Sequence, residues 1–325
     1  MAEAVQSILR QSFTDFELIL IDDGSNDGSS EDLARFAQSD PRVRLIKNAE
    51  NLGLTRSLNK GIGQALGEFI ARQDADDISL PHRLLRQVEA MDSEPGLAFL
   101  GAGIIEMDDE GREGAISLQP SHAAVIKRKM LFENAFFHPT VIWRSKAFSE
   151  NGLFYDENLR YAQDYKLFSQ ALWQCGGGNL AEPLLKFRAH GGQISKQRVE
   201  GQQTVADQVA WKNFKAFGLG GEFKREDVAL LRRLGIRSTG LSSEERSRQW
   251  ALWRGLFDRL EADLKPAELA EWRQVKRVRL KLLRRNLAVW PLLPLQLAGV
   301  LASDPWGAIG DLVEVTRNRL RPGRG

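Results

Sequence analysis

Cysteine is almost absent from this chain of 325 residues, because Cys175 is the only one. A single cysteine cannot form an intrachain disulfide, and it cannot build a zinc site from cysteine ligands. The sequence therefore lacks the crosslinks typical of small secreted domains. We expect a protein of a reducing compartment.

Long apolar runs are also lacking. The longest, residues 287–302, is interrupted by Pro291 and Pro294 and contains Gln296, so it is too broken for a membrane-spanning helix. The first residues, MAEAVQSILRQSF, have the apolar spacing of a helix and no basic region ahead of an apolar stretch, unlike a signal peptide. We expect a cytoplasmic protein, either free or peripheral on the inner face of the cell membrane.

The chain has little net charge, +2, but its two parts differ. Residues 1–200 hold 22 basic and 29 acidic side chains, whereas residues 201–325 hold 23 and 14. With 42% hydrophobic and 27% charged residues, the composition is that of a globular protein and excludes a disordered or collagen-like chain. We expect these two ranges to be separate regions.

Short apolar runs alternate with amphipathic stretches in the first region. Strands are expected at residues 16–21, 43–46, 68–71 and 97–102, with helices between them. The first run, FELILI, is almost wholly apolar and predicts a strand covered on both faces. This alternation predicts an α/β fold with a mostly parallel sheet flanked by helices, whose ligands bind beyond the carboxyl ends of the strands.

The second region is predicted to be all-helical. Apolar residues recur every three or four positions over residues 250–264, and Ser242 with Glu245 forms a capping-box pattern upstream. A further helix is expected to begin at Pro266 and to carry Val278 on its inner face.

The last predicted helix is strongly basic. Residues 273–285 include seven basic side chains and no acidic one. Together with the apolar, Trp-containing segment that follows, this pattern favours docking on an anionic membrane surface, and the alternative is a solvated helix face. Aromatic RNA-binding and DNA-reading motifs are missing, so no nucleic-acid partner is expected.

Two acidic motifs follow predicted strands. IDDGS, residues 21–25, offers a carboxylate that could accept hydrogen bonds from a nucleobase or ribose. QDADD, residues 73–77, places Asp74 and Asp76 on one side of an extended chain, and two converging carboxylates suit Mg²⁺ or Mn²⁺. From the residues alone, a turn and a solvated acidic loop are the alternatives.

Four segments together carry a family resemblance. They are SILRQSFTDFELILIDDGSNDGS, NLGLTRSLNKGIGQALGEFIARQDADDISLPHRL, FFHPTVIWR and YAQDYKLF, in that order. In order and spacing they resemble the inverting family 2 glycosyltransferases of the GT-A fold over about residues 3–195. The resemblance implies a GT-A domain at residues 1–200, a nucleotide-diphosphate sugar as donor, and an acidic DXD-type motif at residues 74–76.

The resemblance also implies roles on the donor side. Nucleotide-sugar binding would belong to Asp22, Asp23, Arg56 and Asp74. The metal, Mg²⁺ or Mn²⁺, would be held by Asp74, Asp76 and His190, with Asp76 as the principal ligand. Arg188 and Lys196 are further candidates beside the diphosphate or metal.

On the acceptor side, Asp164 takes the place of the family's catalytic base, although the usual preceding Glu is Gln163 here. A carboxylate in that place would take the proton of the acceptor hydroxyl. His138 would border the acceptor site. From the residues alone, Asp164 could instead be a helix N-terminal carboxylate and His138 part of a structural turn.

One departure from the family concerns its opening strand and loop, of the type VSVIIPVYN, which this sequence does not contain. The resemblance implies that this strand is central in the sheet and that its loop helps to hold the nucleotide. Without them we expect a gap in the core and an incomplete donor site. Either the natural start lies upstream of Met1, or the chain is a degenerate copy.

We therefore expect a metal-dependent inverting glycosyltransferase that transfers a sugar to a glycan or lipid-linked acceptor in cell-surface polysaccharide synthesis. The alternative is a non-catalytic, degenerate protein that binds a nucleotide sugar or a glycan. A third hypothesis is an adaptor that docks through the basic helix.

Overall fold

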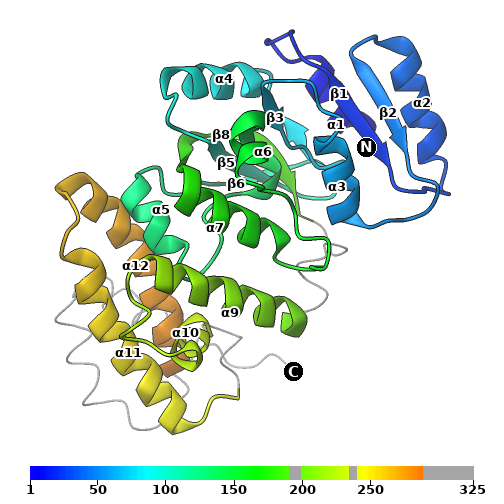
Figure 1. Cartoon of the computed structure of the whole chain (residues 1–325). Helices are drawn as coiled ribbons and strands as arrows, with labels where there is room; N and C mark the ends of the chain where they lie inside the picture. The colour runs from blue at the N-terminus through cyan, green and yellow to red at the C-terminus, as the bar shows by residue number, and fades with distance from the viewer. Residues whose placement is uncertain (190–198, 234–239, 288–325) are drawn as a thin grey trace, which may run out of the picture. The chain divides into compact units, whose positions relative to one another are not determined.

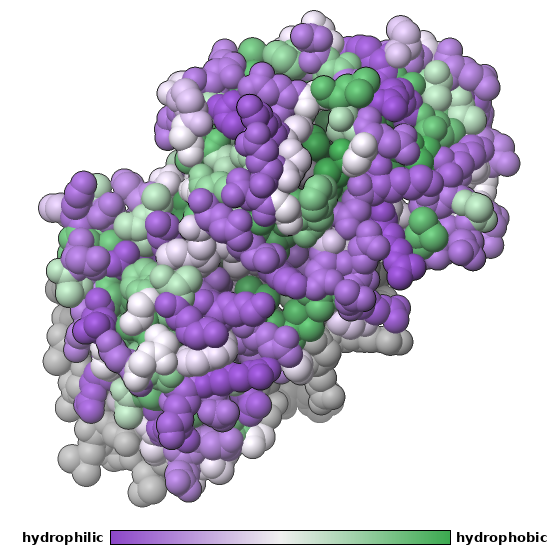
Figure 2. Space-filling model, in the orientation of Figure 1, coloured by the Kyte–Doolittle hydropathy of each residue, from purple (hydrophilic) through white to green (hydrophobic). Residues whose placement is uncertain are grey.

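The fold was analysed in a computed structural model, which describes residues 1–189, 199–233 and 240–287 (Figure 1). The chain forms two compact units, residues 1–223 and residues 224–325. None of the helices in the described ranges combines the length and the apolar character needed to cross a membrane. On the face drawn in Figure 2, hydrophilic residues predominate and hydrophobic ones form smaller patches.

The first unit begins with helix α1 (Ala2–Leu9), which confirms the helix expected there. Polar contacts fasten α1 and the next residues to the segment before helix α4 (Arg83–Ser93). The Ser79 N–H donates to Ser7 Oγ at 3.1 Å, and the Gln11 side chain donates to the Leu80 carbonyl at 2.7 Å. This segment also carries the acidic motif, so α1 supports the site from outside the sheet.

Strands β1 (Leu18–Asp22) and β2 (Val43–Lys47) pair in parallel and form a two-stranded sheet of their own. Helices α2 (Ser29–Ser39) and α3 (Leu54–Ile62) pack with it. Gly61 permits close packing of α3, because a Cβ there would lie 2.7 Å from Ile21 Cδ1. Residues 16–21 are only half-buried, so the predicted cover on both faces is wrong. Among the described residues, β1 pairs with a strand along one edge only.

The second sheet of the first unit has six strands. They run in the order β3 (Phe69–Ala71), β7 (Ile142–Arg144), β5 (Phe99–Met107), β8 (Gly177–Arg188) and β4 (Ile78–Ser79), with β6 (Glu113–Ser117) pairing β5. The β5–β8 pair is parallel, and the other pairs in this sheet are antiparallel. The predicted α/β class with flanking helices is confirmed. The prediction of a mostly parallel sheet is wrong, because among the described residues only the β1–β2 and β5–β8 pairs are parallel.

The remaining short helices of this unit are α5 (Ala123–Lys129), the 3₁₀ turn η1 (His138–Thr140), α6 (Ser145–Glu150) and α7 (Gln163–Cys175). An aromatic core joins α7 to the sheet, since the ring of Phe99 stacks on Phe168 at 5.6 Å and contacts Phe136 at 4.7 Å. Gly177 makes room for Phe99, because a Cβ there would lie 2.2 Å from its ring. This core fixes the beginning of α7 relative to the sheet.

Helix α9 (Val199–Ala216) lies beyond the boundary expected near residue 200, but it belongs to the first compact unit. Its Asn213 side chain donates to the Met130 carbonyl at 2.5 Å and accepts from the Trp173 indole at 3.0 Å. These contacts join α9 to α7 and to the segment after α5.

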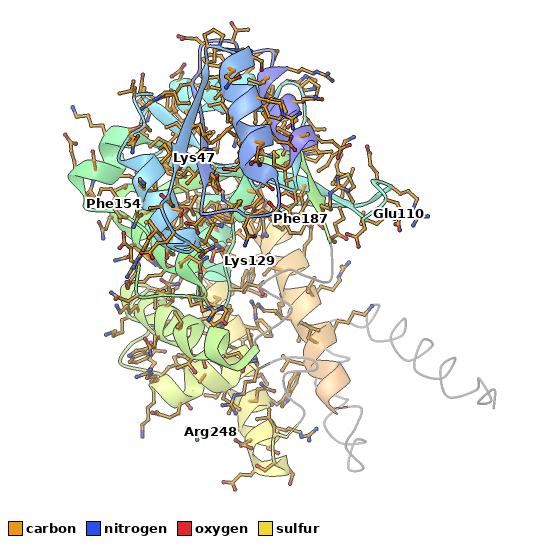
Figure 3. The ribbon with its side chains drawn as sticks, turned by 90° about the vertical axis from the view of Figure 1, so that its right-hand side faces the viewer. Lys47, Glu110, Lys129, Phe154, Phe187 and Arg248 are labelled. Carbon is orange, nitrogen blue, oxygen red and sulfur yellow. The ribbon has the colours of Figure 1, made fainter. Side chains whose placement is uncertain are left out.

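The second unit contains helices α10 (Arg225–Arg232), α11 (Ser243–Glu261) and α12 (Pro266–Leu287). The predicted capping box is confirmed, because the Glu245 N–H donates to Ser242 Oγ at 3.1 Å and the Ser242 N–H donates to Glu245 Oε2 at 2.8 Å. Arg248, labelled in Figure 3, pairs with Asp227 of α10 at 2.6 Å. The prediction that Val278 lies on the inner face of this helix is wrong, since its side chain is 62% exposed.

Candidate active site

Asp22 ends β1 and is buried, with 3% of its surface exposed. Its carboxylate accepts a hydrogen bond from the Ser30 hydroxyl, and the Ser25 N–H donates to Oδ1 at 2.9 Å. These hydrogen bonds lower the pKa of Asp22 below its ordinary value. The contacts fasten the turn between β1 and α2.

Asp23 is surrounded by donors from the segment between β2 and α3. Its Oδ1 accepts from the Asn48 side chain at 2.8 Å, the Leu52 N–H at 2.8 Å and the Ser57 hydroxyl at 2.9 Å, and its Oδ2 accepts from the Gly53 N–H at 2.9 Å. Burial raises the pKa of Asp23, but these donors outweigh it and lower the pKa below its ordinary value. Most of its acceptor capacity is used within the chain, and the more open oxygen is Oδ2.

Arg56 lies on α3 with 57% of its side chain exposed, and its Nε is 3.6 Å from a carboxylate oxygen of Glu157. Such an exposed pair contributes little to stability. The guanidinium is therefore accessible to a ligand at the carboxyl end of the small sheet.

Beyond β3, the structure brings three carboxylates together: Asp74, Asp76 and Asp77. One oxygen from each lies within 4.8 Å of the others. Asp74 and Asp76 were predicted to converge, whereas Asp77 was not singled out, although it is the last residue of the same motif. Asp77 is buried, at 1% exposure, and one of its oxygens, Oδ2, has no hydrogen-bond partner.

Burial raises the pKa of Asp77 to about 7, and the neighbouring charges of Asp74 and Asp76 add to the rise. The Arg188 N–H, which donates to Asp77 Oδ1 at 2.9 Å, opposes it. A buried carboxylate oxygen without a partner is costly unless a cation or a proton compensates it. This oxygen fits a hard divalent cation bound by the cluster.

Two buried arginines compensate the cluster from within the chain. Both terminal nitrogens of Arg72 bind the Asp74 carboxylate, and the Arg72 side chain is 4% exposed. Arg83 is fully buried and donates to Gln73 Oε1 at 2.8 Å and to the Arg72 carbonyl at 2.6 Å, and burial lowers its pKa to about 9. The site therefore contains two buried arginines beside the cluster of carboxylates.

Asp164 lies in the first turn of α7, after Ala162. Ala162 has a φ of 54° and is the only non-glycine residue in the described ranges with positive φ. Such backbone is strained for an L-residue, and strain of this kind is concentrated at functional sites. It turns the chain so that Asp164 meets Asn134, whose side chain donates to Asp164 Oδ2 at 2.9 Å.

Burial raises the pKa of Asp164 above its ordinary value, opposed by the Tyr165 N–H, the Asn134 side chain and the charge of Arg72. A carboxylate with a raised pKa is a stronger base when ionised. The charge of Arg72 lowers the pKa of Asp164, as it lowers the pKa of Asp77.

His138 and Tyr155 lie nearby. His138 Nε2 and the Tyr155 hydroxyl share a hydrogen bond of 2.6 Å, and the His138 ring is 5.8 Å from the ring of Phe168 on α7. Burial, followed by the charge of Arg72, lowers the pKa of His138 well below its ordinary value, so the imidazole is neutral at physiological pH. His138 thus lies against Tyr155 and Phe168, and its role at an acceptor site stays a prediction.

Three further candidates lie at or beyond the end of β8. Arg188 donates to the Asp76 carbonyl at 3.1 Å and pairs with Glu3 of α1 at 3.0 Å, so it fastens the acidic segment. His190 and Lys196 lie outside the described residues.

Comparison with known proteins defines the class of this protein, a glycosyltransferase with the GT-A fold. The chain belongs to glycosyl transferase family 2, whose family model matches residues 1–152. An uncharacterized glycosyltransferase of Haemophilus influenzae is 31% identical over 219 residues, which are 65% of this chain and 68% of that protein. The amylovoran biosynthesis glycosyltransferase AmsE of Erwinia amylovora is 31% identical over 61% of this chain and 74% of its own length.

Solved structures support the same fold. S. aureus TarS 1-349 in complex with UDP-GlcNAc has a TM-score of 0.55 at 17% identity, and the match covers 85% of this chain and 86% of that one. A longer TarS chain gives the same TM-score at 19% identity, with 88% of this chain and 50% of that chain covered. At these identities the likeness concerns the fold alone.

Proposed function

We propose that this chain is a metal-dependent inverting glycosyltransferase that moves a sugar from a nucleotide-diphosphate sugar to a hydroxyl of a glycan or lipid-linked acceptor. One observation carries the proposal: the structure has a cluster of three carboxylates that could hold a cation and, separately, a half-buried carboxylate, Asp164, bound by Asn134 in the first turn of α7. Catalysis by single displacement needs these two functions on separate groups. The named role of AmsE in amylovoran biosynthesis supports cell-surface polysaccharide synthesis as the setting.

Asp76 and Asp77 would hold Mg²⁺ or Mn²⁺, with Asp74 contributing when it is not bound by Arg72. The fit rests on the unpartnered, buried oxygen of Asp77 and on the oxygen-only donor set, which suits a hard cation. When bound, the cation supplies charge neutralisation to the departing diphosphate. His190, the third ligand implied by the family, stays a proposal.

Asp164 would act as the general base. As the acceptor oxygen forms its bond to the anomeric carbon, Asp164 takes the hydroxyl proton, and the bond from that carbon to the diphosphate oxygen breaks. Asn134 would hold one oxygen of this carboxylate in place. Attack from the side opposite the leaving group inverts the anomeric centre.

The nucleotide would lie at the carboxyl ends of β1 and β2, the usual ligand edge of such sheets. Asp23 Oδ2 and the exposed Arg56 guanidinium are the available groups there. Asp22 would act by fixing the turn, because both of its oxygens already accept hydrogen bonds. His138 would border the acceptor.

The exposed face of α12 supports a membrane-proximal location. Arg273, Arg277 and Lys281 are exposed there at four-residue spacing, with the exposed Val278 beside them. Such a stripe suits the anionic inner leaflet, on which a lipid-linked acceptor would be presented.

The experiment that tests the function is titration calorimetry with UDP, GDP and dTDP, with and without Mn²⁺, followed by transfer assays with the matching nucleotide sugars. We expect Mn²⁺-dependent binding of one nucleotide and transfer that Asp164→Asn abolishes, with Asp92→Asn on the exposed face of α4 as the matched control. Nucleotide binding with no transfer by the parent protein would favour the non-catalytic alternative. Absence of both would overturn the proposal.

A further inference from the structure

Arg72 is fixed in the site by its own main chain. Its N–H donates to the Val141 carbonyl at 2.9 Å, next to the turn that carries His138, and its carbonyl accepts from Arg83 at 2.6 Å. With both main-chain groups bound and the side chain 4% exposed, Arg72 has little freedom to reorient.

The guanidinium of Arg72 is only partly satisfied. Its two terminal nitrogens bind Asp74, but Nε is buried and has no hydrogen-bond partner. An arginine carries five N–H donors, and a buried donor without an acceptor is destabilising. A residue that served only as the counterion of Asp74 would not need to leave Nε in this state.

The contacts of Arg72 place it beside the carboxylate cluster. Both of its terminal nitrogens bind Asp74, and its main-chain N–H binds the Val141 carbonyl next to the turn that carries His138. The unpartnered Nε therefore belongs to a side chain that already contacts the proposed cation-binding carboxylates. A planar guanidinium suits phosphate and hydroxyl oxygens in such a setting.

We propose that Arg72 is a donor-binding residue, whose Nε–H donates a hydrogen bond to an oxygen of the nucleotide-diphosphate sugar beside the carboxylate cluster. This inference rests on the proposed function. The oxygen belongs either to the diphosphate or to the sugar, and these two sources are separated by the probes below.

The test compares Arg72→Gln with Arg72→Met. Both changes remove the charge and the bonds to Asp74, but the glutamine amide nitrogen stands where Nε stands, whereas methionine has no donor. We expect Arg72→Met to bind the nucleotide sugar about tenfold more weakly than Arg72→Gln, because one hydrogen bond to the ligand is lost. Affinities within twofold of each other would overturn the inference, since both variants would then act through Asp74 alone.

The probes are UDP, GDP and dTDP, and UDP-glucose, GDP-mannose and dTDP-glucose, measured by calorimetry with Mn²⁺. A difference already present with the nucleoside diphosphate assigns the oxygen to the diphosphate, and a difference that needs the sugar conjugate assigns it to the sugar. Arg86→Gln and Arg86→Met, on the exposed side of α4, are the matched controls and should bind equally.

If neither variant folds, Arg72→Lys replaces them, because it keeps a charge for Asp74 and lacks Nε. Weaker nucleotide-sugar binding at an unchanged melting temperature would support the inference, and unchanged affinity would overturn it. Should the parent protein bind none of the probes, the proposed function fails. If the parent protein binds a probe and the Arg72 variants bind it with equal affinity, only the proposed role of Arg72 fails.

Discussion

Asn134 and Asp164 are thirty positions apart in the sequence, yet the Asn134 amide donates to Asp164 Oδ2 at 2.9 Å. Asn134 is itself oriented, because its Oδ1 accepts from the Phe136 N–H at 3.2 Å. The proposed base is thus held by a side chain that the fold supplies from a different segment. This contact fixes the direction of one oxygen of the Asp164 carboxylate.

This relationship predicts that Asn134→Leu lowers turnover with little effect on nucleotide affinity. Leucine has a similar volume but cannot donate, so the base loses its orientation, and we expect kcat to fall by roughly tenfold. Steady-state kinetics and calorimetry on the same preparation check this. Weakened nucleotide binding at constant kcat would show that Asn134 serves the donor instead.

Asp164→Asn should separate stability from activity. Burial raises the pKa of Asp164 in the folded protein, so the carboxylate is destabilising when it is ionised. The parent protein then gains stability from this group only at low pH and loses it as the pH rises through the folded-state pKa. We expect Asp164→Asn to melt higher than the parent at pH 7, with the difference shrinking as the pH falls through the raised folded-state pKa and absent below about pH 4.

Transfer by Asp164→Asn should fall by about 10² to 10⁴, the usual contribution of a general base. Melting curves across the pH range and transfer assays with Asp92→Asn alongside provide the check. A variant that melts lower than the parent at pH 7 would contradict the assigned direction of the pKa.

The left-handed backbone of Ala162 predicts how substitutions at this position change the free energy of unfolding. Glycine adopts a φ of 54° without steric cost, alanine pays about 1–2 kcal/mol, and a β-branched residue fits least well. Because glycine also has a more flexible unfolded state, we expect Ala162→Gly to gain at most about 1 kcal/mol and Ala162→Val to lose stability. Urea denaturation gives the order of the free energies of unfolding. Ala90→Gly and Ala90→Val within α4 are the control and should give a different order, because glycine is unfavourable inside a helix.

The basic stripe of α12 predicts salt-sensitive binding to anionic vesicles. Replacing Arg273, Arg277 and Lys281 by glutamine should weaken binding to phosphatidylglycerol vesicles by roughly 100-fold, at about 1 kcal/mol for each charge. Replacing the exposed Arg35, Lys47 and Lys146 of the first unit is the charge-matched control. Equal sedimentation of the two triple variants with the vesicles would remove membrane docking through α12.

Local patterns in the sequence predicted the elements well, because strand and helix periodicities are local properties. The capping box of Ser242 and the start of α12 at Pro266 are confirmed for this reason. The half-burial of β1 could not be predicted, since an apolar run does not say which neighbours will cover it.

In the candidate site, too, local features could be predicted from the sequence, whereas contacts made by tertiary packing could not. The acidic motif and Asp164 are visible as residue types near strand and helix ends. The unpartnered oxygen of Asp77 and the Asn134 contact depend on tertiary packing, which no spacing encodes. Arg72 could have been noticed, because alternate residues of an extended chain share a side and Arg72 stands two positions before Asp74.

The separation of β1 and β2 from the six-stranded sheet has a consequence for local unfolding. Two-stranded sheets are marginally stable by themselves, and β1 and β3 each have one edge without a strand partner among the described residues. The amides of β1 should therefore exchange with solvent faster than those of β5, which has partners on both sides. The same open edges are templates for strand addition, so self-association through them should grow with protein concentration.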